Sequence, residues 1–191
     1  MKHPQCEERR LLDFGFGAAT ADGGYEHQLR WFRADPAFDA ECSAQYAELC
    51  ARAARGELDA LQASAEGSLA LVLLLDQLPR NIHRGRPEAF AADEKARAVA
   101  RRAIERDFDK ELTKPQRLFL YLPFEHSESL ADQDLALELI GALGDEEQTY
   151  WARRHHDVIA RFGRFPRRNA ILGRDSTAEE TAFLNSPEPS F

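Results

Sequence analysis

The sequence predicts an all-α fold of about eight helices in antiparallel pairs, forming a tetratricopeptide-like right-handed helical array. Apolar residues recur every three or four positions through most of the 191 residues, which is the spacing of one helix face. Helix-start signals, such as Asp before Pro, precede most of these stretches. No stretch alternates apolar and polar residues or carries an Asn-Gly hairpin turn, so we expect no sheet.

The helices are expected to belong to one domain spanning residues 1–191, with residues 185–191 as a C-terminal tail. A chain of this length buries one sizeable core but hardly two. No clean repeat of about 34 residues, the tetratricopeptide period, is present. The helix pairs are therefore expected to be irregular rather than copies of one unit.

Two helices are predicted in the N-terminal third of the chain. The first runs from about Cys6 to Phe16, and a loop follows at Thr20–Gly24. The second begins at Asp35-Pro36, because Asp suits the N-cap position and Pro suits the first helical position. Gly56 is expected to end this helix.

The run from Leu69 to Leu75 is apolar on every face. It is far shorter than the ~20 residues that a membrane span requires. Because Leu and Ala dominate it, we interpret it as a buried central helix rather than a strand. It should stop near Leu78, since the residue before Pro79 disfavours the helical conformation.

Start signals predict five further helices towards the C-terminus. One runs from Pro87 to about Arg106, and the last ends near Leu184. The other start signals are Thr113-Lys114-Pro115-Gln116, Ser129, Asp145 and, for the last helix, a capping box at Ser176-Thr177-Ala178-Glu179.

Charge and cysteine content exclude several classes of protein. The net charge is −8, from 25 basic and 33 acidic residues, which argues against nucleic acid as a partner. No apolar segment resembles a secretory signal or a membrane span, so we expect a cytoplasmic protein without a membrane partner. Cys6, Cys42 and Cys50 form an odd set without paired spacing, which is typical of reduced thiols.

Arginine is concentrated in two stretches. Residues 80–86 hold three Arg and no acid, and residues 151–174 hold seven Arg and one acid, Asp157. Arg grips carboxylate and phosphate groups with two parallel hydrogen bonds, so these stretches favour a site for an anionic group. Alternatively, they pair with acids of the chain or with helix C-terminal carbonyls. Arg161, Arg164, Arg167 and Arg168 with the interleaved Phe162 and Phe165 would also allow RNA contacts, but these two Phe are rather expected to pack the helix end into the core.

Asp76 and Gln77 interrupt the most apolar segment and are expected to be buried. A buried carboxylate needs a partner, and Arg80 and Arg84 are the candidates. Such a pair either pins the end of a helix or orients an Arg that clamps a ligand.

Two histidine-containing stretches are candidates for general acid–base chemistry. Glu125 directly precedes His126, but adjacent helical residues point apart, so the two are no obvious dyad. His155 lies on an apolar stripe, as a hydrogen-bonded core residue would, whereas His156 points off that stripe and is the better candidate. His126, His156 and nearby acids could ligate a metal, but no zinc-binding motif is present, so no metal or cofactor is predicted.

Two of these stretches are similar to each other in sequence. Pro79–Arg86 reads Pro-Arg-Asn-Ile-His-Arg-Gly-Arg, and Pro166–Arg174 reads Pro-Arg-Arg-Asn-Ala-Ile-Leu-Gly-Arg. Each follows an apolar-striped helix and precedes another helix start, so we expect two similar helix-to-helix turns. Asn81 and Asn169 would fix these turns or donate to a ligand.

Several segments, spread over nearly the whole chain, resemble the bacterial family known as domain of unknown function 924. The segments are Asp13-Phe14, Phe16-Gly17, Trp31-Phe32, Leu74–Asn81, Phe119–Glu128, Arg161–Pro166 and Asn169–Arg174. The chain departs from the family pattern at Gly15, Leu78 and Arg167. The resemblance implies a tetratricopeptide-like helical fold and no established activity.

We therefore expect a helical-repeat protein that binds an anionic small molecule or an acidic peptide segment. The residues expected to hold the anion are Arg80, Arg84, Arg164 and Arg168, with Asp76 and Gln77 orienting them and Asn81 and Asn169 in support. One alternative is a hydrolase acting on a phosphorylated or carboxylated substrate, with His126 or His156 as general base and Glu125 as a partner. The other is a structural or interaction scaffold in which every Arg pairs with an acid of the chain.

Overall fold

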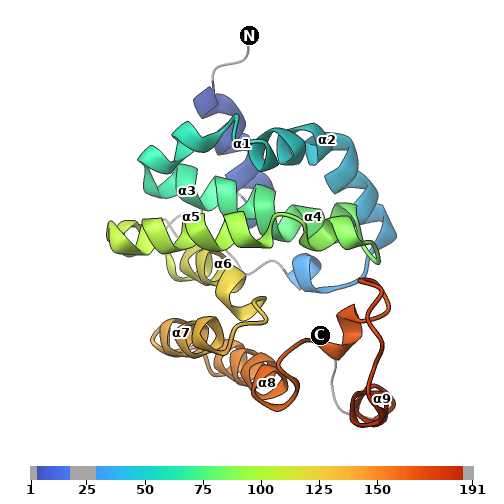
Figure 1. The fold of residues 1–191 in the computed structure, drawn as a ribbon. Helices are drawn as coiled ribbons and strands as arrows, with labels where there is room; N and C mark the ends of the chain where they lie inside the picture. Colours follow the sequence, from blue (N-terminus) through green and yellow to red (C-terminus); the bar gives the residue numbers. More distant parts are fainter. Residues whose placement is uncertain (1–3, 18–28, 187–191) are drawn as a thin grey trace. The chain divides into compact units, whose positions relative to one another are not determined.

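The computed structural model describes residues 4–17 and 29–186 (Figure 1). Within these ranges all regular structure is helical and no strand occurs, which confirms the predicted all-α class. The predicted loop at Thr20–Gly24 and residues 187–191 of the predicted tail lie outside the described residues. The tetratricopeptide-like pairing stays a prediction.

The chain divides into two compact units. The first comprises the described residues of 1–84 and 88–123, and the second comprises those of 85–87 and 124–191. That the whole chain forms one domain stays a prediction.

The first unit is built around a buried apolar helix. Its helices are α1 (Pro4–Phe16), α2 (Pro36–Ala54), α3 (Ala65–Val72), α4 (Leu78–Ile82), α5 (Asp93–Glu105) and most of α6 (Lys114–Glu125). α3 contacts α1 and α5, and α4 contacts α2. The segment from Leu69 to Leu75 is buried throughout, so the predicted central helix is confirmed.

The central helix continues past the point where it was expected to stop. A π-helical turn at Leu73–Gln77 joins α3 directly to α4. In this turn the N–H of Leu78 donates to the carbonyl of Leu73, one residue further back than in an α-helix. Pro79 then falls in the first turn of α4, where a missing N–H is tolerated. The prediction of a stop near Leu78 is therefore wrong. If α3 to α4 counts as one segment, the described residues form eight α-helical segments.

The second unit contains α7 (Leu130–Gly141), α8 (Glu146–Phe162) and α9 (Ala178–Leu184). α7 and α8 pack against each other and are the two orange-brown helices of Figure 1. Val158, Ile159 and Phe165 form a buried cluster, against which Phe162 and Phe183 pack. Because Phe183 belongs to α9, this cluster attaches the last helix to α8.

Two helix starts carry their predicted side-chain caps, whereas Ser129 precedes α7 without a capping hydrogen bond from its side chain. The Asp35 carboxylate accepts hydrogen bonds from the N–H groups of Ala37 and Phe38, and Asp145 caps α8 in the same way. Pro87 opens a 3₁₀ turn at Pro87–Phe90, and the helix proper begins only at Asp93.

The last capping box lies one residue later than predicted. Thr177 accepts from the N–H of Glu180, whose side chain accepts from the N–H of Thr177. The hydroxyl of Ser176 instead accepts a hydrogen bond from Asn169 at 3.1 Å. The predicted box of Ser176 with Glu179 is therefore wrong.

Cys42 and Cys50 are free and buried. Burial raises the pKa of each thiol to about 12, so both remain protonated and unreactive at neutral pH. The side chain of Cys6 is not among those described. Among the described residues, no helix combines the length and the hydropathy that crossing a membrane requires.

Candidate functional site

Arg80 is held by two acidic side chains of the first unit. Its Nη1 and Nη2 donate to the two carboxylate oxygens of Asp93 at 2.9 and 3.0 Å, and Nη1 also lies 3.2 Å from Oδ1 of Asp76. Gln77 Nε2 donates to the other oxygen of Asp76 at 2.6 Å. Asp76 and Gln77 are both buried, as predicted. They lie on the π-helical turn, a distortion that is frequent at functional sites.

Arg84 and Asn81 share one carboxylate on α2. Arg84 donates to both oxygens of Asp39, with Nε–Oδ2 2.6 Å and Nη2–Oδ1 2.8 Å. Asn81 Nδ2 adds a bond of 2.9 Å to Oδ1. The hydrogen bond from Arg84 is the largest influence on the Asp39 pKa and, with that from Asn81, lowers it against the opposing effect of burial. The segment Pro79–Arg86 is thereby fastened to α2; its first four residues lie in α4, so the predicted turn begins only after Ile82.

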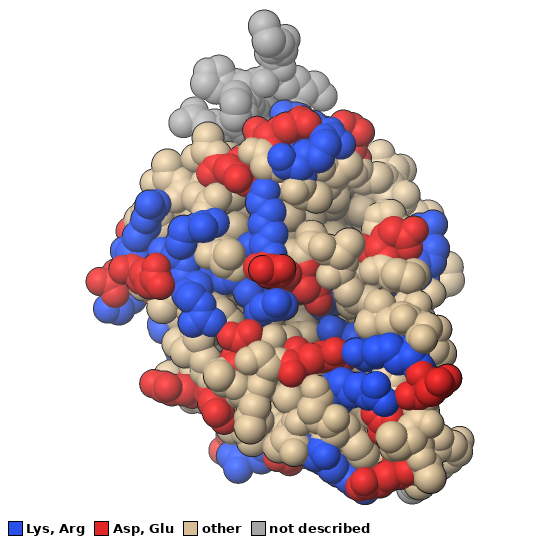
Figure 2. Space-filling view, viewed as in Figure 1, with Lys and Arg blue, Asp and Glu red and all other residues tan. Residues whose placement is uncertain are grey.

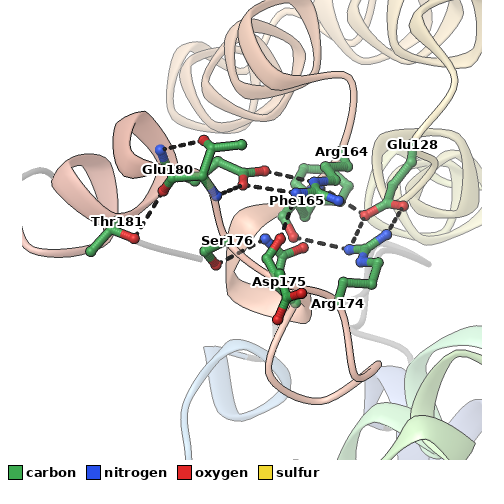
Figure 3. Close-up of polar contacts among 10 residues, drawn as sticks. Glu128, Arg164, Phe165, Arg174, Asp175, Ser176, Glu180 and Thr181 are labelled. Atoms are coloured by element: carbon green, nitrogen blue, oxygen red, sulfur yellow. Dashed lines mark hydrogen bonds and ion pairs between the residues drawn. The ribbon is translucent and has the colours of Figure 1, made fainter.

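In the second unit, Arg164 forms a two-pronged pair with Glu180 of α9 (Figure 3). Nε–Oε1 is 2.6 Å and Nη2–Oε2 is 2.8 Å, and Nη2 also donates to the carbonyl of Asp175 at 2.9 Å. The hydrogen bond from Arg164, with that from the N–H of Thr177, lowers the pKa of Glu180 to about 2. Glu180 thus caps α9 and binds Arg164 at the same time.

Glu128 fastens the turn after α8 to the α6–α7 connection (Figure 3). It accepts from Nη1 and Nη2 of Arg174 at 2.7 and 2.9 Å, and its Oε1 also accepts from the N–H of Phe165 at 2.8 Å. Asn169 is fully buried, and its Oδ1 has no hydrogen-bond partner among the described residues. Glu128 lies in one of the family-like segments but was not predicted as a site residue.

The buried carboxylate of Glu125 pairs with His155. Oε1 of Glu125 lies 3.0 Å from Nδ1 of His155, which also lies 2.9 Å from the carbonyl of Trp151. His155 is therefore a hydrogen-bonded core residue, as predicted, but its acidic partner was missed. The two residues are 30 positions apart, and nothing local in the sequence marks them as a pair.

His126 and Arg168 lie next to this pair. The ring centroids of His126 and His155 are 6.2 Å apart. Arg168 Nη2 donates to the backbone carbonyl of His126 at 2.9 Å, and the guanidinium lies over the ring of Phe165, 4.5 Å from its centroid. Phe165 is thus in contact with both the guanidinium of Arg168 and the imidazole of His155, whose ring centroid lies 5.7 Å from its own.

His156 contacts a different set of groups. Its Nε2 lies 3.0 Å from Asp134 on α7, and its Nδ1 lies 3.5 Å from the neighbouring Asp157. Within the described ranges, no three or more His, Cys, Asp or Glu side chains are grouped in a way that could hold a metal ion.

A model of the family described as bacterial protein of unknown function (DUF924) matches residues 11–188. The chain belongs to this family. It is also similar to a solved structure of a protein of unknown function, ATU0120, from Agrobacterium tumefaciens, with 39% sequence identity and a TM-score of 0.86. That similarity covers 96% of this chain and 99% of the other. No curated protein matches the chain.

The predicted site residues of this DUF924 protein fall into two sets, one in each unit. Asp76, Gln77, Arg80, Asn81 and Arg84 belong to the first unit, and Glu125, His126, His156, Arg164, Arg168 and Asn169 belong to the second. Arg80, Arg84 and Arg164 are each paired with acids. On the face drawn in Figure 2, basic side chains likewise adjoin acidic ones in several places.

Proposed function

We propose that this DUF924 protein is a binding module for an anionic small molecule or an acidic peptide segment, contacted by Arg168 and His126. The setting of Arg168 carries this proposal. Its guanidinium is stacked on Phe165 and anchored by the carbonyl of His126. Stacking fixes the plane of an Arg, and a planar guanidinium suits carboxylate or phosphate oxygens; the charge of Arg168 also acts on the Glu128 carboxylate of the same unit.

The other predicted anion-binding arginines have a different setting. Arg80, Arg84 and Arg164 each place two parallel hydrogen bonds on a carboxylate of the chain. An external anion would have to displace that carboxylate, which leaves an uncompensated charge behind. In the proposal these arginines hold the scaffold, and the residues that support them are Asp76, Gln77, Asn81 and Asn169.

Thermal unfolding with inorganic phosphate and with succinate tests this proposal. Saturable stabilisation of the wild-type protein is expected, with an affinity that falls about tenfold or more in Arg168→Gln, because a hydrogen bond to a charged group is lost. His126→Gln removes the imidazole but keeps the backbone carbonyl that anchors Arg168. Its effect on anion affinity therefore reports the contribution of the imidazole alone.

Arg161→Gln is the matched control. Arg161 lies in the same unit, is exposed and pairs with Glu179, so its replacement should leave the anion affinity unchanged. If no anion stabilises the wild-type protein, or if Arg168→Gln and Arg161→Gln behave alike, the proposed site is wrong.

The Glu125–His155 pair favours a second candidate, a hydrolase acting on a phosphorylated or carboxylated substrate. A carboxylate that holds Nδ1 of an imidazole orients the ring so that Nε2 exchanges protons. In this candidate the general base is His155, in place of the expected His126 or His156, and Glu125 is the residue that orients it.

Hydrolysis of p-nitrophenyl phosphate and p-nitrophenyl acetate tests this candidate. Activity should be lost in His155→Gln, fall in Glu125→Gln, and persist in His156→Gln. Turnover at background level in the wild-type protein would remove it.

We also propose a cytoplasmic location. The unpaired thiols of Cys42 and Cys50 support it, because reduced cysteines are typical of that compartment.

A further inference from the structure

An aromatic cluster in the first unit surrounds an arginine that lies outside both Arg-rich stretches. Arg30, in the 3₁₀ turn Leu29–Phe32, lies over the ring of Phe14 of α1 and over the ring of Phe38 of α2. The distances from its guanidinium carbon to the two ring centroids are 4.7 and 4.6 Å. One Nη atom donates to the carbonyl of Phe14. The guanidinium is therefore held by the two rings and by the hydrogen bond from one Nη.

Arg30 differs from the arginines of the two turns in its electrostatic partners. Among the residues that the structure describes, its contacts are a neutral carbonyl and two rings, and none is a carboxylate. Its Nε is buried without a hydrogen-bond partner within those same ranges. A donor in that state is costly unless an acceptor reaches it.

Tyr46 of α2 supplies a second buried donor in the same cluster. Its ring centroid lies 4.8 Å from that of Phe14, the residue is 3% exposed, and its hydroxyl has no partner in the described part of the chain. Burial raises the pKa of Tyr46 above its ordinary value, so the hydroxyl keeps its proton at neutral pH and can donate.

Groups that act in both directions on the pKa of Tyr46 lie around it. Arg10 and Arg30 both lie close enough to act on its pKa in the lowering direction. Arg10 itself donates to a neutral side-chain oxygen, that of Gln45, at 3.4 Å. Glu41 and Cys42 act in the raising direction. Two buried donors, one of them on a cation, are suited to an anionic oxygen.

We propose that Arg30 and Tyr46, which both pack against the ring of Phe14, form a binding site for the carboxylate group of a small ligand, whose oxygens accept from Arg30 Nε and from the Tyr46 hydroxyl. A single negative charge suits this aromatic setting better than a phosphate dianion, because burying charge is costly. The site lies within the first unit and is independent of the binding proposed for Arg168.

Trp31 provides a local reporter for this site. Its indole donates to the carbonyl of Gly15 at 2.9 Å, and its ring centroid lies 5.1 Å from that of Phe38. The chain has two tryptophans, so Trp151→Phe leaves Trp31 as the only one. In that background, titration with acetate should change the Trp31 emission saturably.

Arg30→Gln and Tyr46→Phe should each weaken acetate binding about tenfold or more, since each removes a hydrogen bond to a charged group. Arg33→Gln is the matched control, because Arg33 is exposed and only three positions from Arg30. The acetate affinity of this variant should stay within about twofold of wild type, which is a small change in binding free energy. A Trp31 signal that does not saturate, or equal losses in Arg30→Gln and Arg33→Gln, would overturn the proposal.

Tyr46→Phe also has a signature in the protein without ligand. Because it removes a buried hydroxyl that has no partner in the described residues, it should leave the melting temperature unchanged or raise it. The extra stability that acetate provides should disappear in the same variant. A lowered melting temperature with unchanged acetate affinity would show that the hydroxyl serves the fold, and would contradict the proposal.

Asp22 and Glu26 precede Arg30 in the chain and lie outside the described residues, so a further variant tests whether the chain supplies the carboxylate itself. Unchanged acetate affinity in Asp22→Asn/Glu26→Gln supports a separate ligand. Acetate binding that tightens about tenfold or more would mean that one of these side chains already competes for the site, and the proposal would fail.

Discussion

The two similar turns, Pro79–Arg86 and Pro166–Arg174, are held in place by different contacts. In Pro79–Arg86, Asn81 and Arg84 converge on one carboxylate, that of Asp39. In Pro166–Arg174, the Asn and the last Arg have separate partners, the Ser176 hydroxyl and the Glu128 carboxylate. Each turn has a glycine at positive φ beside its paired Arg, Gly85 at 75° and Gly173 at 65°.

The residue after the proline differs most between the two turns. Arg80 is paired with two acids and is 18% exposed at its side chain. Arg167, which also follows a proline, is exposed and has no ion pair within the described ranges. Similar sequences therefore place one Arg in a buried network and the other at the surface. The concentration of Arg in a stretch of sequence predicts where positive charge is high, but it does not predict which Arg stabilises the fold.

Replacing Arg80 should have the largest effect on stability. Arg80→Met leaves Asp76 and Asp93 without their shared cation, and losing one member of a buried ion pair costs about 3–5 kcal/mol. Chemical denaturation of the variant should show a loss of unfolding free energy in this range.

Arg167→Met is the matched control at the corresponding position of the other turn. An exposed side chain outside any network changes stability by about 0.5 kcal/mol or less. Equal losses of unfolding free energy in Arg80→Met and Arg167→Met would show that the two arginines do not differ in their contribution to stability.

The two fastening pairs should show coupling in double-mutant cycles. Arg84→Met with Asp39→Asn, and Arg174→Met with Glu128→Gln, should each give a coupling of about 1 kcal/mol. The Arg174–Glu128 coupling should be the larger, because Arg174 is 25% exposed and Arg84 is 43% exposed, and solvent screens the latter more. Urea unfolding of the single and double variants measures both; a coupling of zero would show that the pair does not hold its turn.

The two turn glycines should respond alike. An added Cβ meets nothing within 4 Å at Gly85 or at Gly173, so only the positive φ opposes a side chain. Gly85→Ala and Gly173→Ala should each cost about 1 kcal/mol. Unequal losses in thermal unfolding would mean that the turns differ in more than their side-chain partners.

Acid should weaken the ion pair by which Glu180 of α9 holds Arg164. Its pKa falls from 4.5 to about 2 in the folded protein, mainly through Arg164. A lowered pKa means that Glu180 contributes stability above pH 4.5, and that this contribution is lost as the pH falls towards about 2. Carbon-13 NMR titration of the Glu180 carboxyl should show that Arg164→Gln moves its pKa back towards 4.5; an unmoved pKa would assign the shift to another group.

The helices were predictable because their signals are local. Asp35-Pro36, Asp145 and the apolar stripe of α8 each act within a few residues, so the sequence alone places them. The π-helical turn was missed because its hydrogen bonds depend on the packing around Leu73–Gln77, not on a local residue signal.

For these pairs of the candidate site, the sequence predicted one member but not its partner. The sequence marks Arg84 and His155 as polar groups that need partners, but Asp39 lies 45 positions from Arg84 and Glu125 lies 30 from His155. Only the tertiary fold brings such residues together. Arg30 was missed for a different reason, because a single Arg gives no excess of charge in the sequence.

The most direct test of the account measures stability and anion affinity in the same two variants, Arg84→Gln and Arg168→Gln. Arg84 is paired with Asp39, whereas Arg168 is stacked on Phe165. We expect Arg84→Gln to lower the unfolding free energy by about 1 kcal/mol, while the folded protein binds succinate as the wild-type protein does. Arg168→Gln should lose succinate affinity about tenfold or more, with the smaller change in stability. The reverse result, with succinate binding lost in Arg84→Gln and kept in Arg168→Gln, would contradict the account.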